Sequence, residues 1–335
     1  MGYRLSYERM DEIITELSSK YRIYAPRFDA QKKRVRYGLI KSVKQIVTDR
    51  QSDYSPKEVF YPVSQVMFYF RDDSVEESEL SDDREILIIA RACDINAIRR
   101  QDNIFLKNGG TEDIFYKRNR DRVRFALLEC KESFENCFCV SVGSNKTEDY
   151  AFAININEED VLIDVKDDSL GNIFANEDAD DYKVRFVEQN KKAVKIPRID
   201  HDNLKAVSEL EYWKKFDDTC AACGGCNAVC GTCTCFDTID IVYDQGSNDG
   251  ERRRVWSGCM LADFTKTAGG ETARKTPGAN MRFKVFHKFF DYRERFGTEH
   301  MCVGCGRCDI RCPKNISFFD TVCEIHDEIV KNVRK

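Results

Sequence analysis

The sequence predicts an α+β fold class, in which a mixed α/β amino-terminal domain over residues 1–205 is followed by an α-helical domain over residues 206–335. In the first part, short apolar runs alternate with segments of helical periodicity, as in a sheet that packs against helices. Two runs of four cysteines occur in the second part, and the long segment between them is interpreted as mostly helical. We therefore expect helices to carry two cysteine-rich loops, in place of a compact strand-containing unit.

Capping and periodicity predict the first elements. Ser6 can cap a helix in which Met10, Ile13, Ile14 and Leu17 recur along one face. Strand-like runs follow at residues 21–24, 35–40 and 59–70. Residues 72–85 are acidic and almost free of apolar side chains, which predicts a solvated loop.

A second group of strands begins at residue 85. Residues 85–90 (EILIIA) predict a strand that is buried on both faces, and a helix follows through Ile98. Residues 123–128 repeat the strand pattern. Residues 150–156 and 161–165 alternate as the two arms of a hairpin do.

The turn after the strand at residues 85–90 contains Arg91, Cys93 and Asp94, in a position that commonly faces ligands in an α/β sheet. These residues are therefore candidates for a site. The alternative is a buried thiol beside a helix-capping aspartate. The sequence contains no Walker A loop, no dinucleotide-binding fingerprint and no HExxH zinc motif. We interpret the amino-terminal domain as a scaffold or docking platform.

Helical patterns flank the cysteine runs. Residues 210–216 form a helical approach to the first run. Residues 281–296 predict an aromatic-rich helix that ends at Gly297. Ser317 can cap a last helix that carries Val322, Ile325 and Ile329.

The two cysteine runs share one spacing. The first is Cys220-x2-Cys223-x2-Cys226-x3-Cys230, and the second is Cys302-x2-Cys305-x2-Cys308-x3-Cys312-Pro313. Three cysteines at steps of three let one loop wrap a [4Fe–4S] cluster with three thiolates. Zinc would take four thiolates in two separated pairs and would leave four of these eight unexplained. The runs therefore predict two [4Fe–4S] clusters.

The fourth cysteine of each run lies outside its loop, and in two-cluster ferredoxins of this spacing it binds the other cluster. We therefore assign Cys220, Cys223, Cys226 and Cys312 to the first cluster. Cys302, Cys305, Cys308 and Cys230 are assigned to the second. Gly231 stands where the second run has Pro313, and we expect this difference to matter little.

Half of the sixteen cysteines remain after this assignment, among them two C-x-C pairs. We expect a candidate third cluster held by Cys233, Cys235 and Cys259, with a fourth ligand from Cys130, Cys137 or Cys139. Such a cluster would join the two domains. The alternative is a set of inert buried thiols that behave as small hydrophobic residues.

Composition narrows the class of protein. The chain has 53 basic and 58 acidic residues and a formal net charge of −5, which argues against nucleic acid as the main partner. Sixteen cysteines without an apolar leader indicate a reducing compartment, where thiolates bind metal. The sequence has no apolar run long enough to span a bilayer. We expect a cytoplasmic protein with neither membrane nor nucleic-acid partners.

Several segments combine these features in a recognisable order. They are RACDIN (91–96), SFENCFCV (133–140), GSNK (143–146), CAACGGCNAVCGTCTCF (220–236), RRRVWSGC (252–259) and HMCVGCGRCDIRCP (300–313). Together they resemble the iron–sulfur electron-transfer subunit of anaerobic sulfite reductase over nearly the whole chain. The beta subunits of cytosolic sulfhydrogenases share much of the carboxy-terminal pattern.

The resemblance implies a non-catalytic subunit of an oxidoreductase complex. In the anaerobic sulfite reductase family, the iron–sulfur subunit relays electrons from an NADH-oxidising flavoprotein subunit to a sirohaem subunit that reduces sulfite to sulfide. This chain would then carry clusters but no flavin or haem. The alternative is the equivalent beta subunit of a cytosolic sulfhydrogenase or of a similar flavin-linked complex.

Overall fold

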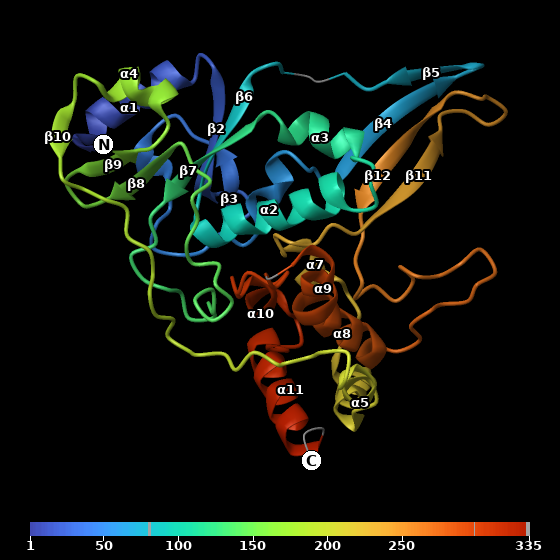
Figure 1. The fold of residues 1–335 in the computed structure, drawn as a ribbon. Coiled ribbons are helices and arrows are strands. Elements are labelled where there is room, and N and C mark those ends of the chain that lie inside the picture. Colours follow the sequence, from blue (N-terminus) through green and yellow to red (C-terminus); the bar gives the residue numbers. More distant parts are fainter. Residues whose placement is uncertain (80–81, 298, 333–335) are drawn as a thin grey trace.

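A computed structural model describes residues 1–79, 82–297 and 299–332. Figure 1 shows an amino-terminal α/β unit above a group of carboxy-terminal helices, with a smaller sheet that projects to one side. Within the described ranges, no helix is long and apolar enough to cross a membrane. The predicted fold class, a mixed α/β region followed by a cysteine-rich dicluster region, is confirmed.

The larger sheet has eight strands in the order β10-β1-β9-β8-β7-β6-β2-β3. The strands are β1 (Gly2–Leu5), β2 (Tyr21–Asp29), β3 (Arg34–Leu39), β6 (Glu85–Ala90), β7 (Val123–Leu128), β8 (Phe152–Ile156), β9 (Val161–Val165) and β10 (Asp178–Asp180). The neighbours β2, β6, β7 and β8 run parallel, and the other pairs are antiparallel. The carboxyl ends of the parallel strands therefore share one edge, where ligand sites form in α/β folds.

Helices cover both faces of this sheet. They are α1 (Tyr7–Leu17), α2 (Ala92–Lys107), α3 (Ile114–Arg120) and α4 (Gly171–Phe174). Successive side chains of β6 point to opposite faces of the sheet. Leu87 and Ile89 pack in the hydrophobic cluster that contains α1, whereas Ile86 and Ile88 pack in the cluster that contains α2. The prediction of a strand buried on both faces is confirmed.

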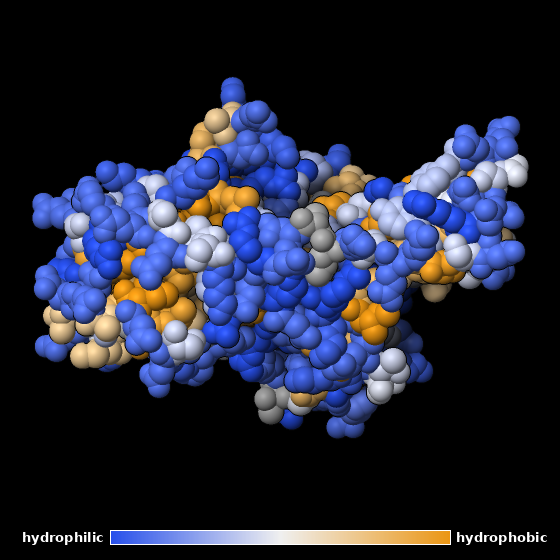
Figure 2. All heavy atoms as spheres, turned by 90° about the horizontal axis from the view of Figure 1, so that it is seen from above, coloured by the Kyte–Doolittle hydropathy of each residue, from blue (hydrophilic) through white to orange (hydrophobic). Residues whose placement is uncertain are grey.

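The smaller sheet has the order β11-β12-β4-β5 and is antiparallel throughout. Its strands are β4 (Ser64–Arg71), β5 (Ser74–Glu77), β11 (Phe236–Val242) and β12 (Gly250–Trp256). Seen from above, this sheet projects from a mostly hydrophilic body (Figure 2). Because β12 pairs with β4, residues from both predicted domains build one sheet, and the boundary at residue 205 stays a prediction.

The smaller sheet corrects two expectations. The β11–β12 hairpin lies between the cysteine runs, where we expected helices. Its strand β12 pairs with β4, which is distant in the sequence, so local periodicity could not reveal this sheet. The acidic segment at residues 72–85 is solvated but is not all loop, because β5 pairs with β4 and remains exposed along its length. Residues 80 and 81 of that segment lie outside the described residues.

The carboxy-terminal helices surround a core of their own. They are α5 (Leu204–Ser208), α6 (Lys215–Thr219), α7 (Gly225–Ala228), α8 (Pro277–Phe286), α9 (Tyr292–Phe296), α10 (Arg307–Arg311) and α11 (Phe318–Asn332). A π-helical turn at His287–Asp291 joins α8 to α9, and the helix ends at Gly297 as predicted. Single 3-10 turns lie at Val43–Gln45, Pro56–Val59, Asp168–Leu170 and Glu211–Lys214.

The predicted helix caps are found. The Ser6 side chain accepts a hydrogen bond from the backbone N–H of Arg9 at the start of α1. The Ser317 hydroxyl accepts one from the backbone N–H of Asp320 at the start of α11. Asp94 does not cap α2: it lies in the first turn of that helix, and its carboxylate pairs with Arg307.

Candidate metal centres

The first cysteine quartet lines one cavity, which Cys308 of the second quartet also lines. Cys220 lies at the end of α6, Cys223 in the loop that follows, Cys226 in α7 and Cys312 at the end of α10. Burial raises the pKa of the Cys220 thiol, and the thiols of Cys226, Cys312 and Cys223 act on it in the same direction. Cys312 therefore lies beside the cysteines of the other run. The crossed assignment stays a prediction, and this placement supports it.

The second quartet lies deeper in the molecule. Cys305 is 8% exposed, whereas Cys223 of the first quartet is exposed. Cys230 lies close enough to Cys302 and Cys305 to raise the pKa of each thiol, in addition to the larger effect of burial. Burial raises the pKa of Cys302 to about 12, so its free thiol is protonated at neutral pH. A metal that binds it must displace that proton, which couples metal binding to pH.

Both cysteine loops use the same left-handed backbone positions. Gly224 and Gly306 have φ values of 68° and 72°, and each precedes a short helix. Ala222 and Gly304 occupy the matching positions earlier in the loops, with φ values of 48° and 60°. The N–H of Gly304 also lies 3.4 Å from the Cys302 Sγ. Hydrogen bonds to ligand sulfur are one way in which proteins set a cluster potential.

The amino-terminal domain packs directly on the second loop. A Cβ at Gly304 would lie 2.5 Å from the carbonyl carbon of Phe138, and a Cβ at Gly306 would lie 2.3 Å from the Asn136 oxygen. The Phe138 N–H donates to the Gly304 oxygen at 2.7 Å. Only glycine fits at these two positions, because any side chain would meet backbone atoms.

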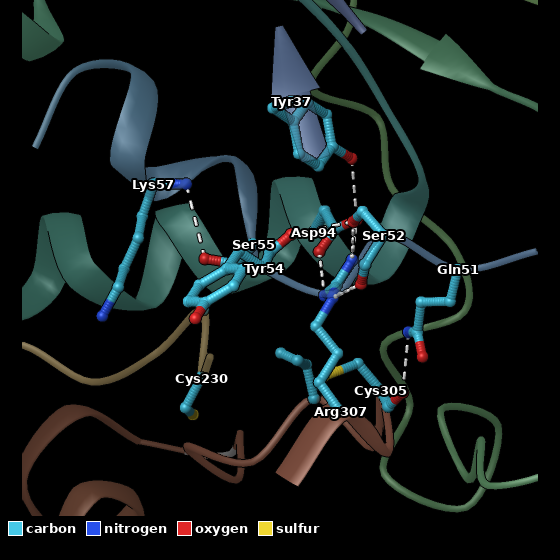
Figure 3. Close-up of polar contacts among 12 residues, drawn as sticks. Tyr37, Gln51, Ser52, Tyr54, Ser55, Lys57, Asp94, Cys230, Cys305 and Arg307 are labelled. Atoms are coloured by element: carbon cyan, nitrogen blue, oxygen red, sulfur yellow. Dashed lines mark hydrogen bonds and ion pairs between the residues drawn. The ribbon is translucent and has the colours of Figure 1, made fainter. Parts of the chain in front are cut away.

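A buried ion pair fastens the second loop to the amino-terminal domain (Figure 3). Arg307 lies between Cys305 and Cys308, and its guanidinium pairs in bidentate fashion with Asp94 at 2.5 and 2.8 Å. It also donates to the backbone oxygen and hydroxyl of Ser52, both at 2.9 Å. The Tyr37 hydroxyl donates to Asp94. The exposed fractions of Arg307 and Asp94 are 2% and 0%, so each charge depends on the other.

Buried lysines face the thiols from α8 and the π turn. Lys284 and Lys288 are each 3% exposed. Burial lowers the pKa of Lys284, but the thiols of Cys226 and Cys308 outweigh it and raise that pKa well above its ordinary value. Cys226 belongs to the first quartet and Cys308 to the second, so Lys284 acts on both. A [4Fe–4S] cluster with four thiolates carries net negative charge, and these buried cations fit such a group.

The structure brings Cys233, Cys235 and Cys259 of the expected third cluster together. The Asn227 amide nitrogen lies 3.4 Å from the sulfur atoms of both Cys233 and Cys259. Cys235 lies close enough to Cys259 to raise the pKa of its thiol. Lys57 donates to the Cys233 carbonyl at 3.0 Å.

The three candidates for the fourth ligand have other neighbours. Cys137 and Cys139 have contacts with Cys305, Cys93 and Asn190 in place of the Cys233 group. Burial raises the pKa of the Cys130 thiol; the nearby Arg91 lowers this pKa and the nearby Cys139 raises it. The second quartet thus touches two separate sets of cysteines, through Cys305 on one side and Cys230 on the other. The third cluster of Cys233, Cys235 and Cys259 with Cys130, Cys137 or Cys139 stays a prediction, and these contacts do not support it.

Sequence reasoning missed the charged residues around the thiols. Arg307 stands inside the second cysteine run, and a charge in a buried metal loop is a signal that could have revealed its pairing with Asp94. The spacing of Lys284 and Lys288 by one helical turn gave a weaker signal. Lys57 offered none, because its contacts are with residues distant in the chain.

The class of protein follows from this site and from comparison with known families. A family model described as a 4Fe-4S dicluster domain matches residues 219–316, a range that includes both cysteine runs. The chain carries two [4Fe–4S] clusters, and it is an iron–sulfur protein of the electron-transfer class.

A particular relative extends the comparison to the whole chain. The beta subunit of sulfhydrogenase 2 from Pyrococcus furiosus is 26% identical over an alignment of 354 positions, which covers 98% of this chain and 99% of the relative. No solved structure matches the chain. The chain is a distant homologue of that sulfhydrogenase subunit.

Proposed function

We propose that this chain is the electron-transfer subunit of a cytoplasmic multisubunit oxidoreductase. The observation that carries the proposal is the arrangement of the quartets. Cys223 of the first quartet lies at the surface, Cys305 of the second is buried against the amino-terminal domain, and Lys284 acts on thiols of both. Two clusters held by these quartets would form a path for electrons from the molecular surface to the protein interior.

The chemistry is one-electron transfer. When bound, a [4Fe–4S] cluster accepts and releases one electron at a potential set by burial, charge and hydrogen bonds to sulfur. The chain supplies those influences: Lys284 and Lys288 place positive charge beside the thiols, and the Gly304 N–H lies beside the Cys302 sulfur. Catalysis is assigned to partner subunits, and no residue of this chain is given a catalytic role.

A sulfhydrogenase-type complex is the better supported form of this proposal. The similarity to a sulfhydrogenase beta subunit runs over nearly the full length of both chains. A flavin-containing partner would then deliver or collect the electrons. The partner that docks near Cys223 would meet the first quartet.

A second candidate is the corresponding subunit of an anaerobic sulfite reductase. It is favoured by the segments RACDIN, CAACGGCNAVCGTCTCF and HMCVGCGRCDIRCP, which resemble the iron–sulfur subunit of that family. In this form, the electrons would come from an NADH-oxidising flavoprotein subunit. They would leave to a sirohaem subunit that reduces sulfite to sulfide.

Purification of the complex separates the two candidates. The tagged chain should be isolated anaerobically from its own cells with its untagged partners, and the absorbance of flavin and sirohaem should be recorded. NADH-dependent sulfite reduction with a sirohaem spectrum would establish the sulfite reductase form. Hydrogen-dependent reduction of an electron acceptor without sirohaem would establish the sulfhydrogenase form. A chain that purifies without redox partners would contradict both.

The isolated chain provides a further test. We expect it to accept electrons from a low-potential chemical reductant, because both cysteine quartets belong to it. We expect no turnover of NADH with sulfite and no hydrogen oxidation. Steady turnover by the purified chain alone would reject a role limited to electron transfer.

A further inference from the structure

Four cysteines of the amino-terminal domain gather at the carboxyl edge of the parallel strands. Cys93 follows β6 in the first turn of α2, and Cys130 follows β7. Cys137 and Cys139 lie in the loop that continues from Cys130. The topology therefore delivers four thiols, from the segments that follow β6 and β7, to the edge at which α/β folds build their sites.

Contacts connect these thiols to one another and to the second cluster loop. Cys93, Cys139 and Cys305 belong to one buried group. The Cys137 Sγ lies 3.7 Å from the Cys305 carbonyl oxygen. Cys139 lies close enough to Cys130 and Cys137 to raise the pKa of each thiol, in addition to the larger effect of burial. All four are free thiols.

A buried arginine beside the four thiols has unused donors. Arg91 is 3% exposed, and its Nη2 donates to the carbonyl oxygens of Thr48 and Arg50 at 3.1 and 3.2 Å. Its Nε and Nη1 atoms are buried without a hydrogen-bond partner among the described residues. Its guanidinium acts on Cys130 and lies 4.8 Å from the Phe134 ring centroid. A buried guanidinium with unpaired donors is energetically costly unless an anion lies beside it.

We propose that Cys93, Cys130, Cys137 and Cys139 hold a third [4Fe–4S] cluster, and that Arg91 is its counter-charge. A cluster bound by four thiolates carries negative charge, and it would pair with the Arg91 guanidinium, whose Nε and Nη1 have no other partner among the described residues. Cys93 lies in the first turn of a 16-residue helix, directly after the end of β6. Asn190 donates to the Cys139 sulfur at 3.4 Å, as side chains around cluster sulfurs do.

The position of the site favours a redox centre over zinc. The contacts of Cys93, Cys137 and Cys139 with Cys305 place the group beside the second quartet. A third cluster there would extend the relay to the carboxyl edge of the sheet. Structural zinc sites commonly use cysteine pairs separated by two to four residues, whereas Cys137 and Cys139 are separated by one. The inference does not depend on which partners the chain has.

The test is the iron, acid-labile sulfide and zinc content of the full-length chain after anaerobic reconstitution. We expect about twelve irons per wild-type chain, and about eight in the double variant Cys137→Ser with Cys139→Ser. The matched control is the other C-x-C pair, changed as Cys233→Ser with Cys235→Ser, which should leave the cluster of the amino-terminal domain in place. An iron content that is the same in the wild type and in the Cys137/Cys139 variant overturns the proposal. So does about one zinc per chain that is lost in that variant while the iron stays at about eight.

A measurement on the wild-type chain covers the case in which the double variant does not fold. Cys130 is half-buried and lines an open cavity of about 1100 Å³, so a free thiol there can react with N-ethylmaleimide. We expect mass spectrometry to find Cys130 unmodified in the reconstituted chain and modified after the iron is removed with a chelator. Rapid modification of Cys130 before iron removal would overturn its assignment as a ligand.

Discussion

The two cysteine loops have one backbone design but different surroundings. Both turn through left-handed positions before a short helix, yet the first lines a cavity among carboxy-terminal helices, and the second is covered by the amino-terminal domain. The residues between the cysteines carry this difference. Gly225 of the first loop corresponds to Arg307 of the second, which pairs with Asp94. The repeated cysteines thus specify the metal-binding turn, while the residues between them specify where each turn docks.

The largest expected effect tests whether the quartets are crossed. Cys312→Ser should remove the cluster of Cys220, Cys223 and Cys226, because Cys312 lines their cavity. The cluster of Cys302, Cys305 and Cys308 should persist. Electron paramagnetic resonance of the reduced variant, with each signal assigned beforehand, can measure this. Cys323→Ser is the control, since Cys323 is assigned to neither cluster; selective loss of the second cluster would refute the crossed arrangement.

The next effect distinguishes the buried loop from the exposed one. Arg307→Leu should destabilise the chain by about 3–5 kcal/mol, because it leaves the Asp94 carboxylate buried without its partner. The double variant Arg307→Leu with Asp94→Leu should recover part of that loss. Arg311→Leu, at an exposed position on the same helix, should change stability by less than about 0.5 kcal/mol. Anaerobic denaturant unfolding provides the measurement, and equal losses at positions 307 and 311 would contradict the ion pair's role.

A smaller effect concerns the charge that the two quartets share. Lys284→Met should lower the potentials of both clusters, because a positive charge favours the reduced, more negative state. At an effective dielectric constant of ~20, a unit charge nearby contributes a few kcal/mol, which is on the order of 100 mV for one electron. Lys314→Met is the control: Lys314 lines only the first cavity and is exposed, so a smaller shift confined to the first cluster is expected. A redox titration in which Lys284→Met shifts one cluster alone would show that the charge is not shared.

The sequence was sufficient where short-range patterns determine the structure. The spacing of Met10, Ile13, Ile14 and Leu17 predicted the buried face of α1, and all four are buried. The cysteine spacing predicted the dicluster domain, which the family comparison confirms. In each case, the residues that define the feature lie within a few positions of one another.

The remaining features depend on residues that are distant in the chain. The pairing of β12 with β4 joins segments that no local pattern relates. The pairing of Arg307 with Asp94 has the same origin. Gly231 is a further example, because a Cβ there would lie 2.8 Å from the Ala97 Cβ of α2, so this position is more tightly packed than we expected. Local periodicity contains no information about which distant surfaces meet.

The smallest expected effect compares matching positions of the two loops. Ala222 has a φ of 48°, a conformation that costs a residue with a Cβ about 1–2 kcal/mol. Ala222→Gly would remove this strain but would raise the conformational entropy of the unfolded chain. The net change in stability should therefore be no more than about 1 kcal/mol. Gly304→Ala, at the matching position, should cost more, roughly 2–3 kcal/mol, because backbone strain is joined by a 2.5 Å contact with Phe138. Gly109→Ala isolates the strain, since its φ is 87° and a Cβ there meets no atom. Denaturant unfolding of the three variants measures these losses of stability. If Gly304→Ala costs no more stability than Gly109→Ala, the amino-terminal domain is not in tight contact with the second loop at Gly304.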